Sequence, residues 1–259
     1  MINLAYLEAR NITIQFGGLT AVDHLDFKVE KGQVVSIIGP NGAGKTTIFN
    51  LLTGIYKPNS GEIYFEDRRI DGLPPQKIVA AGLARTFQNI RLFSDMRVIE
   101  NVLVGTHIGT KYSFFDRLFY TGRYRREEAE KTRYAVKLLE EVGLEHRIDD
   151  YADNLPYGEQ RKLEIARAIA TGTKLLLLDE PAAGMNPQES EELRQFILQL
   201  KKQGYTILLI EHDMNVVMNL SDYIYVVDYG KKIAEGLPQE IQNNKKVAVA
   251  YLGESEEEQ

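Results

Sequence analysis

A glycine-rich run in the first fifth of the chain has the residue types and spacing that bind phosphate. It fits the pattern G-x-x-x-x-G-K-[ST] and consists of Gly39, Pro40, Asn41, Gly42, Ala43, Gly44, Lys45, Thr46 and Thr47. Glycines let the backbone approach an anion closely, so that successive N–H groups bind it, and Lys45 adds a point charge for the β- and γ-phosphates. The Thr46 hydroxyl is a suitable oxygen ligand for Mg²⁺. The run therefore predicts a site for a nucleoside triphosphate and its magnesium ion.

A second candidate site lies where an apolar run ends in two carboxylates. Leu175 to Leu178 precede Asp179 and Glu180, and open α/β sheets bind their ligands at the carboxyl ends of strands. We expect Asp179 to hold Mg²⁺, directly or through water, and Glu180 to orient or deprotonate the attacking water. Gln88 and His212 are each expected to close a strand of their own. Taken singly these are ordinary polar strand ends, but behind a phosphate-binding loop their order points to nucleotide hydrolysis.

The elements around these residues follow an alternating β and α pattern. The predicted strands are Leu7–Phe16, Leu25–Val29, Val34–Ile38, Glu62–Phe65, Lys174–Leu178, Tyr205–Ile210 and Tyr223–Val227, and the predicted helices are Thr47–Leu52, Pro187–Lys202 and Asp213–Leu220. From about Val98 to Ala170 the pattern is helical, with Glu127–Leu139 as one charged helix that Gly143 can end. Strands that alternate with helices predict an α/β fold with a mainly parallel sheet, into which a helical subdomain is inserted.

Composition excludes several classes of protein. The chain has 259 residues and 44% apolar residues, enough for one large or two small domains. It contains no cysteine, which excludes disulfides, a thiolate nucleophile and zinc–thiolate sites. The net charge of −6 argues against duplex nucleic acid as the main partner. The chain shows no signal-peptide pattern and no apolar run near the ~20 residues that span a bilayer. We therefore expect a cytosolic protein that docks on a membrane protein. The acidic segment Glu254–Gln259 is expected to be a disordered tail.

Over nearly its whole length the chain resembles the nucleotide-binding subunits of ABC transporters. Gly39–Thr47 matches the Walker A loop of that family, and Asp179 with Glu180 matches the end of its Walker B strand. Gln88 matches the Q-loop glutamine, which in the family touches Mg²⁺ and faces the membrane subunit, and His212 matches the switch histidine near the γ-phosphate. The resemblance implies an ATPase with ATP and Mg²⁺ at this site, with Gln88, Glu180 and His212 as its catalytic residues.

The aromatic partner of adenine is less sharply defined. Phe16 matches the family aromatic that stacks on the base, and Tyr6 is the competing candidate. An aromatic ring provides a sequence-tolerant contact for a base. We assign the role to Phe16.

The signature and D-loop depart from the family pattern. Leu155–Glu159 reads Leu-Pro-Tyr-Gly-Glu where the family has Leu-Ser-Gly-Gly-Gln. Pro156 offers neither a hydroxyl nor an N–H, so that Gly158 and the following helix N-terminus remain as anion binders. The D-loop, Ala183–Asn186, ends in an uncharged residue where the family has aspartate. In the family, the signature of one cassette completes the ATP site of its partner. These changes therefore predict that this chain's signature binds ATP weakly in the partner's site.

Within the family, the chain is most similar to the branched-chain amino-acid importer group. The resemblance rests on Arg85–Phe93, Val98–Gly105, the Tyr-Gly signature, the Ala-Gly D-loop and the aromatic, basic stretch His107–Arg126. That stretch is expected either to dock on a membrane subunit or to pack on its own subdomain, with lipid headgroups as a third alternative. Urea importers and the lipopolysaccharide-export ATPase share much of the pattern.

The resemblance implies a full set of expectations about assembly. The fold is a P-loop NTPase core with an N-terminal antiparallel β region, divided as 1–97 and 171–250 for the core, 98–170 for the helical signature subdomain and 251–259 for the tail. A single cassette needs a second copy or a paralogue, two transmembrane permease subunits and, indirectly, a periplasmic or extracellular solute-binding protein, on the inner face of the cell membrane. A soluble ABC protein of translation or repair, and a nucleotide sensor without hydrolysis, are the alternatives from other classes.

Overall fold

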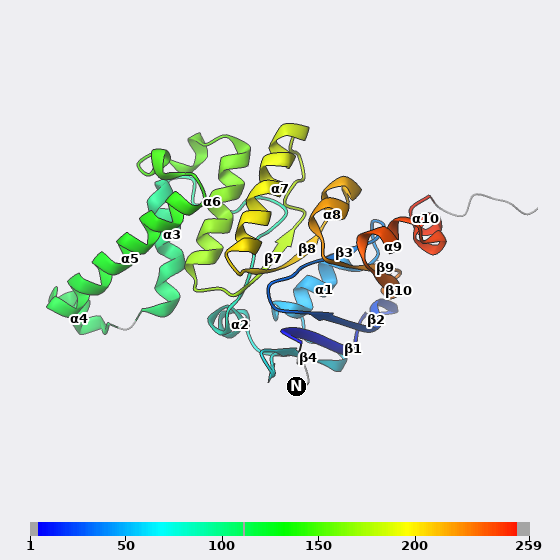
Figure 1. Cartoon of the computed structure of the whole chain (residues 1–259). Helices are drawn as coiled ribbons and strands as arrows, with labels where there is room; N and C mark the ends of the chain where they lie inside the picture. Colours follow the sequence, from blue (N-terminus) through cyan, green and yellow to red (C-terminus); the bar gives the residue numbers. More distant parts are fainter. Residues whose placement is uncertain (1–4, 111, 253–259) are drawn as a thin grey trace, which may run out of the picture.

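Two β-sheets and a group of helices make up residues 5–110 and 112–252, the part of the chain that the computed structural model describes (Figure 1). The smaller sheet is antiparallel and has the order β2-β1-β4-β5. Its strands are β1 (Leu7–Phe16), β2 (Leu19–Val29), β4 (Ser60–Phe65) and β5 (Arg68–Arg69). The predicted start of β2 at Leu25 was wrong: the strand begins at Leu19, which pairs with Phe16 across a tight hairpin. Solvent reaches the first residues of β2, so they lack the apolar alternation that marks its second half.

The larger sheet has the order β10-β9-β3-β8-β7-β6, and β10 is its antiparallel edge strand. The parallel strands are β6 (Leu83–Arg85), β7 (Leu175–Asp179), β3 (Val34–Ile38), β8 (Thr206–Ile210) and β9 (Tyr223–Asp228), with β10 at Lys231–Gly236. Every residue of β3, β7 and β8 is buried, because helices and the second sheet cover both faces. That burial explains the continuous apolar runs in their sequences. The lysine-rich β10 gives no such signal and was not predicted, whereas the strand expected to close at Gln88 is the short β6, which ends three residues earlier at Arg85.

One set of helices packs against the two sheets (Figure 1). They are α1 (Lys45–Leu52), α2 (Pro75–Ala81), α7 (Pro187–Lys202), α8 (Met214–Leu220), α9 (Pro238–Gln242) and α10 (Lys245–Leu252). Asn186 accepts hydrogen bonds from the first amides of α7, and Asp213 does the same for α8. These caps explain why the bounds of both helices were predictable. The three short or polar helices α2, α9 and α10 were not predicted.

A second group of helices forms an arm beside the larger sheet (Figure 1). It consists of α3 (Val98–Thr106), α4 (Phe114–Leu118), α5 (Gly122–Glu141) and α6 (Tyr157–Ala170), joined by short 3₁₀ turns at His107–Gly109, Glu145–Arg147 and Ala152–Asn154. Buried apolar residues of α3, α5 and α6 join those of β7 and α7 in one cluster. The arm therefore shares its core with the sheet that carries the candidate site.

The longest helix, α5, extends beyond the predicted Glu127–Leu139 in both directions. The Thr121 side chain accepts a hydrogen bond from the Tyr124 amide at its start. Gly143 has a φ of 73° directly after the helix, a left-handed conformation that glycine adopts without strain. The predicted stop at Gly143 was therefore right. The predicted tail at Glu254–Gln259 lies outside the described residues, and within the described part no helix is long and apolar enough to cross a bilayer.

Candidate active site

The glycine-rich loop connects β3 to α1 and is closely packed against neighbouring backbone. A Cβ atom at Gly39 would lie 2.0 Å from the Val227 carbonyl oxygen, and one at Gly44 would lie 2.4 Å from that of Ala21. Both glycines also have positive φ angles, 156° and 100°. No other residue fits either position without moving the backbone, so the two glycines hold the loop between β9 and the β1–β2 hairpin.

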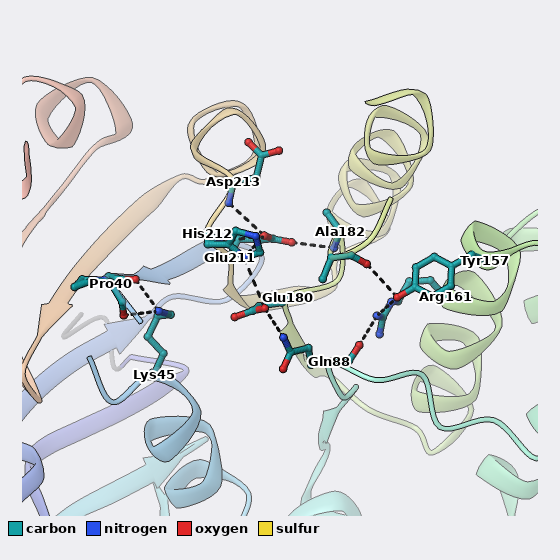
Figure 2. Close-up of polar contacts among 12 residues, drawn as sticks. Pro40, Lys45, Gln88, Tyr157, Arg161, Glu180, Ala182, Glu211, His212 and Asp213 are labelled. Carbon is teal, nitrogen blue, oxygen red and sulfur yellow. Dashed lines mark hydrogen bonds and ion pairs between the residues drawn. The ribbon is translucent and has the colours of Figure 1, made fainter. Parts of the chain in front are cut away.

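Lys45 begins α1 and turns back over the loop. Its ammonium group donates hydrogen bonds to the carbonyl oxygens of Gly39 at 2.6 Å and Pro40 at 2.9 Å (Figure 2). Burial lowers the pKa of Lys45, while the carboxylates of Glu180 and Asp179 act in the opposite direction. The Thr46 side chain, one residue on, is exposed. A cation and a free hydroxyl thus lie together at the N-terminus of α1, where the helix dipole favours an anion.

Asp179 ends β7 and is almost fully buried. Its Oδ2 atom is 2.5 Å from Nη2 of Arg85, which comes from the neighbouring strand β6, and Arg85 also donates to the Asn50 side chain at 2.7 Å. The motif Arg85–Phe93 points to a family but predicts no role for Arg85 itself. The structure shows that it carries the positive charge paired with the buried Asp179 carboxylate.

Glu180, Gln88 and His212 come together although they are far apart in the sequence. Gln88 Nε2 donates to Glu180 Oε2 at 2.7 Å, and His212 Nδ1 lies 3.7 Å from the same oxygen (Figure 2). The Glu180 amide donates to the Ile210 carbonyl at 2.8 Å. Glu180 has a φ of 45°, an uncommon conformation for a residue with a side chain. Gln88 was expected to close a strand, but β6 ends at Arg85 and Gln88 lies in the exposed segment that follows.

Glu211 is a buried carboxylate that holds the loops on both sides of the site. Its oxygens accept hydrogen bonds from the amides of Ala182 at 2.9 Å and His212 at 3.1 Å. Burial raises the pKa of Glu211, and the hydrogen bonds from these amides and from Asp213 partly oppose that shift. One side chain therefore fixes the turn after Glu180 and the start of the His212 loop. No pattern in the sequence distinguishes Glu211 from an ordinary acid at the end of a strand.

The two aromatic candidates for a base contact differ in exposure. Phe16 lies at the end of β1, 42% exposed, with its ring edge-on to Tyr56 at 5.0 Å between centroids. Tyr6 is 7% exposed and packs against Phe65 in the core of the antiparallel sheet. Only the Phe16 ring is therefore open to a ligand. It belongs to the hairpin that meets the phosphate-binding loop through Ala21.

The signature residues lie apart from the chain's own phosphate-binding loop. Pro156 precedes α6 without a side-chain cap, and Gly158 lies in the first turn of that helix. In Figure 2, Tyr157 and Lys45 are on opposite sides of Glu180. Asn186, the last residue of the D-loop, is occupied as the cap of α7. The structure thus brings Gln88, Glu180 and His212 together beside the loop and leaves Gly158 away from it.

A buried arginine joins the signature helix to the Gln88 segment. The Arg161 guanidinium donates to the carbonyl oxygens of Phe87 at 2.7 Å and Gln88 at 2.8 Å, and it pairs with Glu164 at 2.7 Å. Its side chain is completely buried. Arg161 and Glu164 were missed, although two opposite charges three residues apart among the apolar residues of α6 are a detectable signal.

Comparison with known proteins agrees with this geometry. The ABC transporter family description matches residues 22–183, and that of the branched-chain amino acid ATP-binding cassette transporter matches residues 231–257. The high-affinity branched-chain amino acid transport ATP-binding protein BraF of Pseudomonas aeruginosa is 49% identical over 250 residues, which are 96% of this chain and 98% of that protein. The corresponding protein LivG of Escherichia coli is 48% identical with the same coverage.

Solved structures extend the agreement to the fold. An ATP-binding cassette of an ABC transporter in its ADP conformation has a TM-score of 0.85 and 37% identity, over 97% of this chain and all of that one. A nucleotide-free cassette has a TM-score of 0.84 at the same identity and coverage. The α/β P-loop NTPase fold and the ATPase activity expected from the sequence are therefore confirmed. The chain belongs to the ABC transporter family, as one of its nucleotide-binding, ATP-hydrolysing cassettes.

Proposed function

We propose that this chain is the ATP-hydrolysing subunit of an importer for branched-chain amino acids. The observation that carries the proposal is the convergence of Gln88 and His212 on the Glu180 carboxylate, beside a Walker A loop. The names of relatives with 48–49% identity support the substrate class. Reconstitution tests it: uptake of labelled leucine, isoleucine or valine should require this chain and ATP. Uptake of urea alone would contradict the assigned substrate.

We propose the following roles for the site residues. The backbone N–H groups of residues 41–47 and the Lys45 ammonium bind the phosphates, and Glu180 accepts the proton of the attacking water. His212 and Gln88 hold the Glu180 carboxylate and the γ-phosphate in position. Thr46, Asp179 and Gln88 would hold Mg²⁺, because a hydroxyl, a carboxylate and an amide provide the oxygen ligands that this ion prefers. When bound, the ion neutralises charge on the phosphate oxygens.

We also propose the assembly in which the chain works. It docks on two permease subunits at the inner face of the cell membrane and pairs with a paralogous cassette or a second copy, whose signature completes the ATP site. A solute-binding protein delivers substrate on the other side. The division at 97/98 and 170/171 is proposed as the boundary between the core and the signature subdomain, because α3 begins at Val98 and α6 ends at Ala170.

Phe16→Ala is expected to raise the Michaelis constant for ATP with little change in turnover at saturation. A stacked ring stabilises the ground state and the transition state alike, and such a contact is worth ~1–3 kcal/mol. Steady-state kinetics measure both parameters. Tyr6→Ala serves as the control and should lower the melting temperature instead, because its ring is buried. A raised Michaelis constant in Tyr6→Ala alone would transfer the role to Tyr6.

Permease contact is expected next to Gln88. Arg91 and Phe93 are exposed in the segment that follows it. Cysteines placed singly at these two positions should crosslink to the permease in the assembled transporter, and the chain has no native cysteine to confuse the result. A cysteine at Lys202, exposed at the end of α7, is the control. If neither Arg91 nor Phe93 crosslinks in an active transporter, the docking surface lies elsewhere.

The two ATP sites of the assembly are expected to be unequal. Pro156 removes a hydroxyl and an N–H from the half-site that this chain lends, and loss of one preorganised donor costs ~10²-fold or more in rate. A paralogue with a serine signature would complete the stronger site with this chain's Lys45 and Glu180. Glu180→Gln here should therefore reduce transport more than the matching change in the partner. Equal reductions, or full transport with this chain as the only cassette, would contradict the heterodimer.

A further inference from the structure

The end of the helical arm exposes a contiguous group of apolar side chains. In α4 and the two residues after it, exposure is 74% for Phe114, 67% for Phe115, 56% for Leu118, 71% for Phe119 and 63% for Tyr120. Single exposed apolar residues are common on soluble proteins, but a contiguous aromatic group marks an interaction site. The group, called here the α4 tip (residues 114–120), lies at the far end of the arm from the sheets (Figure 1).

Local hydrogen bonds fix the α4 tip in this outward orientation. The Ser113 hydroxyl accepts from the Asp116 amide, and the Asp116 carboxylate accepts from the Ser113 amide at 2.9 Å, which caps the helix at both groups. Asp116 also accepts from the Thr121 hydroxyl at 2.9 Å. The Tyr120 ring packs edge-on against Tyr124, which anchors the tip to α5. The rings are thus held in solvent by a defined turn.

The segment that contains the α4 tip is rich in arginine, although the chain as a whole is acidic, and Arg125 and Arg126 are exposed. Arg117, Arg123, Arg125 and Arg126 lie within residues 113–126, where Asp116 is the one acidic residue, while the net charge of the protein is −6. Acidic residues begin at Glu127, and Glu127 and Glu128 turn to the ammonium group of Lys131. Aromatic rings flanked by arginine complement the interface of a bilayer that contains anionic phosphate headgroups.

A lipid surface fits the α4 tip better than a protein does. A stable protein interface takes about 20–30 residues from each side and matched shapes, whereas the tip offers a few side chains on a projecting turn. A bilayer needs no matched shape. We propose that the α4 tip inserts its aromatic side chains into the headgroup region of an anionic membrane, as a second attachment beside the permease. The proposal rests on the membrane location in the proposed function.

Vesicle co-sedimentation of the full chain tests this proposal without any permease. Binding to phosphatidylglycerol vesicles is expected, with at least tenfold weaker binding to phosphatidylcholine. Phe115→Ser with Phe119→Ser should weaken binding about tenfold or more, and so should Arg125→Gln with Arg126→Gln. The matched control is Tyr151→Ser with Leu237→Ser, two exposed side chains outside the tip, and it should bind as the wild type does.

Two results would overturn the membrane proposal. One is absence of vesicle binding, or binding that the tip variants leave unchanged. The other is loss of permease co-purification in lipid-free detergent with the same variants, which would make the α4 tip a protein contact. ATP turnover of the variants in solution checks their fold. If the chain bound vesicles but did not support amino-acid transport, the membrane proposal would be supported and the proposed function would be contradicted.

A separate observation concerns a closed ring of hydrogen bonds around the catalytic glutamate. The Tyr157 hydroxyl donates to the Ala183 carbonyl at 3.0 Å, and the Ala183 amide donates to the Glu180 carbonyl at 3.1 Å. Arg161 Nη2 donates to the Tyr157 hydroxyl at 3.4 Å and to the Gln88 carbonyl at 2.8 Å. Gln88 Nε2 then donates to Glu180 Oε2 at 2.7 Å and closes the ring (Figure 2).

We infer that Tyr157 and Arg161 are positioning residues for the hydrolytic reaction. Tyr157 occupies the place of a signature glycine, and its hydroxyl supports the turn that holds Glu180 at its strained φ of 45°. Arg161, fully buried, fixes the backbone of Gln88 and the Tyr157 hydroxyl at once. A movement of the Gln88 segment would thus change the position of Glu180 in two ways. One is the direct hydrogen bond from Gln88, and the other is the chain of hydrogen bonds through Arg161, Tyr157 and Ala183.

Tyr157→Phe tests the ring, because it removes only the hydroxyl. We expect turnover to fall about three- to tenfold, as for loss of one or two hydrogen bonds, with an unchanged Michaelis constant for ATP. Hydrogen exchange should become faster in residues 182–186 and stay the same in residues 39–47. Tyr151→Phe, on the exposed turn before the signature, is the control. Unchanged turnover and exchange in Tyr157→Phe, or a change in the Michaelis constant alone, would overturn the inference.

Discussion

Glu180→Gln is expected to retain ATP binding and to slow hydrolysis by ~10²–10⁴-fold, the usual contribution of a positioned general base. The amide has nearly the same shape as the carboxylate but does not accept the proton of the attacking water. The side chain can still accept the hydrogen bond from Gln88 that now lies at 2.7 Å. The variant should therefore accumulate as an ATP-bound dimer, which size-exclusion chromatography with ATP detects.

Two comparisons make the Glu180 result specific. Glu192→Gln on the exposed side of α7 changes the same chemical group and should leave turnover unaltered. His212→Ala examines the other group near the carboxylate, 3.7 Å away. If Glu180→Gln hydrolysed ATP at the wild-type rate and His212→Ala did not, the general base would be His212.

Lys45→Ala is expected to weaken ATP binding by roughly 10–100-fold, the equivalent of one lost hydrogen bond to a charged group. The ammonium now bonds the carbonyls of Gly39 and Pro40, so it already lies over the loop that is to bind the phosphates. Without the ammonium group, only the backbone N–H groups of the loop oppose the negative charge of the phosphates. Isothermal titration calorimetry measures the affinity directly.

A control variant at a surface lysine shows whether ATP binding depends on Lys45 in particular or on the total positive charge of the protein. Lys202→Ala removes an exposed ammonium at the end of α7 and should bind ATP as the wild type does. The melting temperature of Lys45→Ala shows whether the loop still folds. Wild-type affinity in a folded Lys45→Ala protein would mean that the glycine-rich run is not the phosphate-binding loop.

Residues with local physical requirements made much of the fold predictable. A run such as Leu175–Leu178 is stable only between covered faces, so it had to be a buried strand, and its two terminal acids had to lie at the edge of the sheet. Asn186 with Pro187 begins a helix, and Gly143 ends one, through backbone groups a few residues away. Elements without such local signals, β10 and α10, were missed, and the strand expected to end at Gln88 ends at Arg85.

The family, the glycine-rich loop between a strand and a helix, and the strand with its two terminal acids were predictable from the sequence, because each depends on residues that are neighbours in the chain. Which polar groups meet became visible only in the folded chain. Arg85 and Asp179 are 94 positions apart, and Arg161 lies 74 positions from Phe87. Such pairs form because parallel strands and the helical arm bring distant segments together, and the loss of water makes each buried charge require a partner. That requirement acts in three dimensions, so the sequence pattern singled out Glu180, Gln88 and His212 as candidates but not Arg85, Arg161 and Glu211, whose contacts hold the segments around them.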